Sequence, residues 1–157
     1  MYLCQGKQGK QTTMAKGNIV QAWLDQVNED ISAAECLFQG GHFLYVAFLC
    51  HQALEKTLKA YYSATHEDDP PYTHSHGKLL DVCGLTDELS AEHLRFFDFM
   101  VPMYIKARYP EQKVAVAKML SKNTCQHIIQ TTKQLTQWIK ERLPEAKPSK
   151  PSDAINK

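Results

Sequence analysis

Four polar residues near the middle of the chain could bind a ligand together. Gln52, Glu55, Lys56 and Lys59 stand three, one and three positions apart. In an α-helix this spacing predicts that their side chains share one polar side. Amide and ammonium groups of this kind can donate hydrogen bonds to a phosphate or to the edge of a nucleobase. A structural role is equally open, because Glu55 and Lys59 form a favourable i,i+4 pair, and Glu55 and Lys56 could anchor neighbouring helices.

Arg108 and Tyr109, which precede Pro110, are a second pair of candidate ligand-binding residues. The residue before a proline is disfavoured in helical conformation, so this segment is predicted to lie at a helix end. There, the Arg108 guanidinium could cap the last carbonyl groups of the helix. It could instead extend a bidentate fork towards a ligand, with Tyr109 beside it as a stacking surface.

Three histidines, His51, His74 and His76, could contribute acid–base or metal chemistry. His74 and His76 form a His-x-His pair in a predicted loop, but no recognised zinc spacing accompanies them. We therefore predict no metal site and no cofactor. His51 lies on a largely apolar helix, where a hydrogen-bonded core histidine is the more common outcome.

Helices are predicted to position these residues, because apolar residues recur at helical spacing almost throughout the chain. The first apolar stripe runs from Val20 to Phe38, with Asn18 as its predicted N-cap and Gly40-Gly41 as its end. The other predicted helices span residues 42–66, 78–83 and 90–104, and a last one runs from residue 121 or 123 to Pro144. Pro102 is expected to kink or interrupt the fourth of these helices. The predicted fold is all-α, an up-and-down bundle of four main helices plus a short helix.

The chain is expected to form one domain with two tails. Its 157 residues, 43% apolar and 22% charged, can bury a core without disulfides. We predict a flexible leader at 1–17, in which Met14 could be the natural first residue, a helical bundle at 18–143 and a disordered tail at 144–157. Five scattered cysteines, no signal-peptide pattern and no membrane-spanning apolar run indicate a cytoplasmic protein.

Charge is segregated along the chain, although the net charge is only +1. Residues 67–98 carry eight acidic and two basic residues, whereas residues 104–142 carry eight basic and two acidic residues. The two segments could attract one another, within the fold or between subunits, or the basic segment could meet phosphate or an acidic partner. Together with a surplus of aromatic residues, among them Trp23 and Phe99, this pattern favours a symmetric homodimer.

Three sequence blocks resemble the HEPN domain, a family of small helical bundles. They are Gln-Ala-Leu-Glu-Lys-Thr-Leu-Lys-Ala at residues 52–60, Thr-His at 73–74 and Ala-Arg-Tyr-Pro at 107–110. The blocks occur in the order typical of this family, and the resemblance covers about residues 18–143. It implies a bundle whose groove serves as a nucleotide or RNA site. The ligand-binding residues expected on this basis are Gln52, Lys56, Lys59, His74, Arg108 and Tyr109.

Ribonuclease activity is not expected. Many HEPN proteins are metal-independent RNases that carry an arginine followed, after four to six residues, by a histidine, yet none of Arg95, Arg108 and Arg142 has a histidine at that distance. The resemblance therefore favours a non-catalytic module that binds a nucleotide or nucleic acid and could be the partner of a minimal nucleotidyltransferase in a toxin–antitoxin-like pair. A degenerate RNase that uses Arg108 with His51 or His74, or a purely structural dimerisation domain, remains an alternative.

Overall fold

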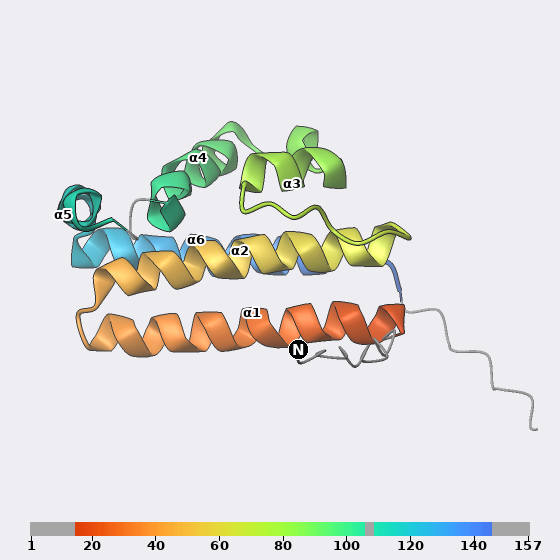
Figure 1. Cartoon of the computed structure of the whole chain (residues 1–157), viewed down its shortest axis with the longest axis horizontal. Helices are drawn as coiled ribbons and strands as arrows, with labels where there is room; N and C mark the ends of the chain where they lie inside the picture. Colours follow the sequence, from red (N-terminus) through yellow and green to blue (C-terminus); the bar gives the residue numbers. More distant parts are fainter. Residues whose placement is uncertain (1–14, 106–108, 146–157) are drawn as a thin grey trace, which may run out of the picture.

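The computed structural model describes residues 15–105 and 109–145 (Figure 1). Within these residues the chain forms six α-helices, one 3-10 helix and no strand, which confirms the all-α prediction. None of the described helices combines the length and the hydropathy that a membrane-spanning segment needs. The elements are α1 (Lys16–Gln39), α2 (Phe43–Thr65), α3 (His76–Cys83), η1 (Thr86–Glu88), α4 (Ala91–Ile105), α5 (Pro110–Met119) and α6 (Lys122–Lys140).

The central helix of the bundle is α2, which packs against α1, α3, α4, α5 and α6. Thirteen of its 23 residues are buried, because small or apolar side chains such as Ala47, Ala53 and Leu54 occupy more than one of its sides. α1 lies along one side of α2, and α3 and α4 lie along the other (Figure 1). α1 and α4 run opposite to α2 and α6, so the four long helices follow the predicted up-and-down order (Figure 1).

Local sequence explains the ends of several helices. The Ser75 hydroxyl accepts a hydrogen bond from the Lys78 backbone N–H at 3.3 Å and caps α3. The Ser121 hydroxyl accepts one from the Thr124 N–H at 3.1 Å and caps α6, near the start predicted for the last helix. α3 ends at Gly84, whose φ of 68° lies in the left-handed region that glycine adopts without strain.

One predicted helix feature, the N-cap, is wrong, and of the two effects predicted for Pro102, a kink or an interruption, the interruption does not occur. Asn18 is not the N-cap of the first helix, because α1 already begins at Lys16 and Ala15 occupies the N-cap position. Pro102 does not interrupt the fourth helix, since α4 continues past it to Ile105. A proline inside a helix removes one backbone hydrogen bond, and the burial of Met100 and Met103 on either side favours continuation.

The hydropathy pattern does not predict α5, which adds a sixth α-helix to the described residues. Only Val116 of α5 is buried, so no apolar stripe reveals this helix in the sequence. Pro110 occupies its first turn, where a missing backbone N–H needs no partner. α5 therefore follows from its local start signal and from its contact with α2 rather than from periodicity.

The fold accommodates most of the surplus aromatic residues without a partner chain. Phe96 and Phe97 are buried in the core, and Phe99 and Trp23 are half-buried. One described ion pair joins the acidic and basic segments, in which Arg142 Nε donates to Glu88 Oε2 at 2.9 Å. Neither the aromatic residues nor the charged segments therefore require a second chain, and the homodimer stays a prediction.

Gly84→Ala should lower the free energy of unfolding by about 1 kcal/mol, because alanine is strained at positive φ. A Cβ at this position would meet nothing within 4 Å, so the cost is conformational and not steric. Gly17→Ala is the matched control, since Gly17 lies in helical α1 and also has open space around it. Urea unfolding should show that this second change is neutral or stabilising. Equal destabilisation by both changes would contradict the assigned role of Gly84.

Candidate ligand-binding site

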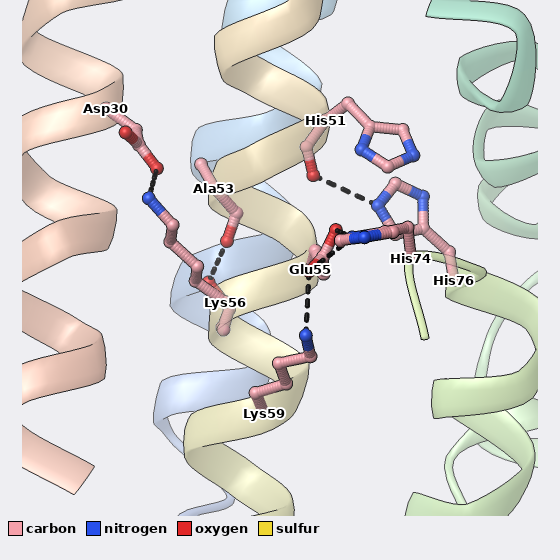
Figure 2. A network of polar contacts seen from close by, with 9 residues as sticks. Asp30, His51, Ala53, Glu55, Lys56, Lys59, His74 and His76 are labelled. Atoms are coloured by element: carbon pink, nitrogen blue, oxygen red, sulfur yellow. Dashed lines mark hydrogen bonds and ion pairs between the residues drawn. The ribbon is translucent and has the colours of Figure 1, made fainter. Parts of the chain in front are cut away.

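The centre of the site is the carboxylate of Glu55, whose side chain is only 5% exposed. Lys59 Nζ donates a hydrogen bond to Glu55 Oε1 at 2.8 Å, as the i,i+4 spacing predicts. His74 Nδ1 lies 3.2 Å from Oε1 and 3.1 Å from Oε2 of the same carboxylate (Figure 2). Burying a carboxylate is costly unless it is paired and hydrogen-bonded, and these two partners meet that requirement.

The contact with Glu55 determines which nitrogen of the His74 ring carries a proton. A carboxylate only accepts hydrogen bonds, so His74 Nδ1 must carry the proton that it donates. The other ring nitrogen, Nε2, is then the position at which protonation changes the ring from acceptor to donor. The His74 side chain is 44% exposed, so a ligand can reach this residue.

Aromatic rings connect His74 to the interior of the bundle. The Tyr104 ring lies 4.4 Å from the His74 ring and 5.1 Å from the His51 ring, measured between centroids. His51 in turn stacks on His76 at 3.9 Å, and His76 Nε2 donates to the His51 carbonyl oxygen at 3.0 Å (Figure 2). The loop before α3 and the first residue of α3 thereby bring the two histidines of the predicted His-x-His pair against α2, His74 at the surface and His76 in the core.

His51 and His76 are held neutral by their surroundings. Both are almost fully buried, at 2% and 1% exposure. Burial, reinforced by the neighbouring His76 and His74, lowers the pKa of His51 from 6.5 to about 2. Burial also lowers the pKa of His76 to about 4, although its hydrogen bond to the His51 carbonyl opposes the shift. Neither ring can meet a ligand at the surface or carry a charge near neutral pH.

Lys56 is engaged on the opposite side of α2. Its Nζ donates to Asp30 Oδ2 at 2.7 Å, which ties α2 to α1. Both side chains are largely buried, at 19% and 14% exposure. Figure 2 shows this pair on one side of α2, whereas His51, His74 and His76 lie on the other.

The structure thus divides the residues that the sequence groups on one helix side. Lys59 and His74 meet at Glu55, and the Lys59 ammonium also lies 5.7 Å from the centre of the Trp23 ring. Gln52 is half-buried and precedes Lys56 by one helical turn. The ammonium groups of both lysines are already paired with carboxylates, so they are less available to a ligand than the sequence suggests.

Of the two remaining predicted residues, the structure describes Tyr109, at the start of α5. Tyr109 is 58% exposed and occupies the N-cap position of α5, so its ring is open to solvent. Arg108 lies outside the described residues. Tyr104 is missing from the predicted ligand-binding residues, and its only sequence signal is its position just before the Ala-Arg-Tyr-Pro block.

No metal-binding group is apparent in the part of the chain that the structure describes, where no cluster of three or more His, Cys, Asp or Glu side chains could hold an ion. His74 and His76 do not converge on a common point, because His74 contacts Glu55 and His76 contacts the His51 carbonyl. The described residues of the site offer hydrogen bonding at Glu55 and His74 and aromatic stacking at His74 and Tyr104.

Comparison with known proteins identifies a family and a fold. The family model for the HEPN domain matches residues 20–143. The crystal structure of TT1696 from Thermus thermophilus is similar, with a TM-score of 0.68 and 20% identity over 80% of this chain and 99% of that chain. The crystal structure of ST0689, an archaeal HEPN homologue, has a TM-score of 0.62 and 20% identity over 80% of this chain and 98% of that chain. No curated protein matches the chain. At this level of identity, the solved structures show the fold alone.

The stacked histidines should make the protein sensitive to acid. Because the folded pKa of each ring lies below 6.5, the unfolded chain binds protons first as the pH falls. The free energy of unfolding is therefore highest above about pH 6.5 and falls as the pH is lowered. His76 alone should reduce it by about 3 kcal/mol on the way to pH 4.

His76→Gln retains a donor for the His51 carbonyl but cannot titrate, so it should flatten this decline. Urea unfolding at several pH values between 7.5 and 4.5 would measure the slope. His42→Gln, at an exposed histidine, is the matched control and should leave the slope unchanged. An identical slope in His76→Gln and the wild type would contradict the role of the stack.

Proposed function

The chain belongs to the HEPN family, and from this premise we propose that it is a non-catalytic module that binds a nucleotide or a nucleic acid. The observation that carries the proposal is the pairing of an accessible histidine, His74, with the buried carboxylate of Glu55. A histidine oriented in this way presents one defined ring edge, and in its protonated form it donates to phosphate.

An aromatic ring beside His74 and another at the start of α5 suit the planar part of such a ligand. Tyr72 is fully exposed, and its ring centroid lies 6.2 Å from that of His74. Tyr109, also exposed, offers a second ring at the start of α5. Aromatic side chains stack on nucleobases with little dependence on base identity, so this surface favours a nucleotide or a single strand. Arg108, which belongs to the Ala-Arg-Tyr-Pro block, is the proposed cation for the phosphate.

The proposed biological setting follows from the family resemblance. We infer that the protein acts in the cytoplasm as a homodimer and as the partner of a minimal nucleotidyltransferase, in a toxin–antitoxin-like pair. The described cysteines, Cys36, Cys50, Cys83 and Cys125, are free thiols, which suits a reducing compartment. Co-purification of the two proteins would support the partnership, and sedimentation as a monomer at micromolar concentration would remove the homodimer and with it the structural dimerisation alternative.

A degenerate RNase is the second candidate, and the Glu55–His74 pair is the observation that favours it. A carboxylate that orients a histidine is a common arrangement for a general base. His51, the other histidine considered for this role, is 2% exposed and cannot reach a ribose hydroxyl. The RNase candidate therefore depends on His74 alone.

Short RNA and adenosine monophosphate should bind weakly to the wild-type protein, with an affinity that falls as the salt concentration rises. His74→Ala and Arg108→Ala should each weaken binding by about tenfold or more, because each removes a charge-assisted hydrogen bond. Fluorescence titration would measure the affinity, with His42→Ala as the control. Thermal unfolding should show that Arg108→Ala costs no more than about 1 kcal/mol. Unfolding of this variant, together with no binding by the wild type, would make Arg108 a structural cap.

Purified protein should not cleave a mixed RNA pool in the absence of metal. In-line attack by a 2′-hydroxyl needs a positioned base and a cation at the phosphate, and loss of one such group costs about a hundredfold or more. Gel analysis of the RNA would test this expectation. Cleavage that disappears in His74→Ala but persists in His42→Ala would overturn it and establish the RNase candidate.

A further inference from the structure

A groove of about 710 Å³ lies between α4 and α6, apart from the site around Glu55. Both helices pack on α2, but they make little contact with one another. The lining residues come from one stripe of each helix, Glu92 to Phe99 on α4 and Asn123 to Gln134 on α6. A volume of this size is within the range of small-molecule sites in proteins.

The floor of the groove is aromatic. Phe96 is 7% exposed, and Phe99 is half-buried. The His127 ring on α6 stands nearly perpendicular to the Phe96 ring, at 87°, with 6.2 Å between the centroids. Two perpendicular rings form a corner in which a flat aromatic group can stack on one ring and meet the edge of the other.

The rim of the groove is polar, and three of its side chains have no partner within the described part of the protein. Among the described residues, the side chains of Arg95, Asn123 and Gln134 make no hydrogen bond or ion pair. The other described arginine, Arg142, is engaged with Glu88 and with the Trp138 ring. The guanidinium group of Arg95 thus borders the groove and has no carboxylate partner among the described residues.

Two smaller hollows between α1 and α6 show the contrasting case. They have volumes of about 320 and 250 Å³, and Lys133 and Glu35 line both. There, Lys133 Nζ donates to Glu35 Oε1 at 2.6 Å, and Lys140 Nζ donates to Asn28 Oδ1 at 3.1 Å. These pairs connect the two helices, whereas Arg95, Asn123 and Gln134 at the α4/α6 groove have no such pair among the described residues.

We propose that the α4/α6 groove binds a planar aromatic anion, with the ring against Phe96 and His127 and the anionic group on Arg95. This site is independent of the one around His74. Glu92 also lines the groove and stands one helical turn before Arg95, so its carboxylate opposes the bound anion. The carboxylate of a small aromatic acid and the phosphate of a nucleotide both match this fork, and competition between them distinguishes the two sources.

The probe for this site is 1-anilinonaphthalene-8-sulfonate, a fluorescent aromatic anion. We expect saturable binding to the folded protein, with backbone amide shifts in nuclear magnetic resonance spectra confined to α4 and α6. Arg95→Gln should weaken binding by about tenfold or more, and Glu92→Gln should strengthen it by about twofold to threefold. Arg95 and Glu92 are exposed, so neither change should alter the thermal midpoint.

Lys118→Gln is the matched control, because it removes an exposed cation from α5 outside the groove, and it should leave binding unchanged. His74→Ala should also leave binding unchanged, which separates this site from the proposed nucleotide site. Displacement of the probe by 1-naphthoate or by adenosine monophosphate would identify the source of the anion. Equal binding by Arg95→Gln and the wild type, or no saturable binding up to millimolar probe, would overturn the proposal.

Discussion

The buried carboxylate of Glu55 constrains much of the structure around it. A charge at this depth is tolerated only with close partners, and Glu55 has one in its own helix and one in the loop that follows. To place His74 on Glu55, the chain must fold back along α2 directly after that helix ends. Ser75 and His76 then follow as the cap and the first residue of α3, and the Tyr104 ring near the end of α4 lies against the His74 ring. One charge thereby connects α2, α3 and α4.

The elements that depend on local sequence are the ones that the sequence predicts well. The long stripes give α1, α2, α4 and α6, and Gly84 marks a helix end through its positive φ. The pair between Glu55 and Lys59 follows from i,i+4 spacing. The sequence groups Glu55 and Lys56 on one polar side of the helix, but successive residues are about 100° apart around a helix, so the two side chains can meet different neighbours. Which neighbour each of them meets, His74 or Asp30, depends on tertiary packing that the spacing does not encode. The stack of His51 on His76 likewise requires the loop to return, and α5 has no apolar stripe to reveal it.

The same packing separates two histidines that serve the core, His51 and His76, from His74, which can serve a ligand. His51 and His76 lie next to each other, buried and neutral, and they hold α3 against α2. His74 is close to them in sequence and in space, yet the carboxylate below it keeps its ring at the surface. A site with one accessible histidine, oriented but not accompanied by an arginine at a fixed helical offset, is better suited to holding a phosphate than to transferring protons across one. This geometry is the support for the proposal of binding without cleavage.

The bundle is organised around one central helix, and this has a consequence for its outer surface. Since α4 and α6 both pack chiefly on α2, neither needs to cover the other. A groove between them is a product of this architecture. The architecture does not determine the chemistry of the groove, because polar side chains that flank a hollow can pair across it, as Lys133 and Glu35 do between α1 and α6. Arg95 has no such partner in the described residues and stands above an aromatic floor. The helix arrangement thus decides where a ligand can enter, and the unpaired guanidinium decides which charge it should carry.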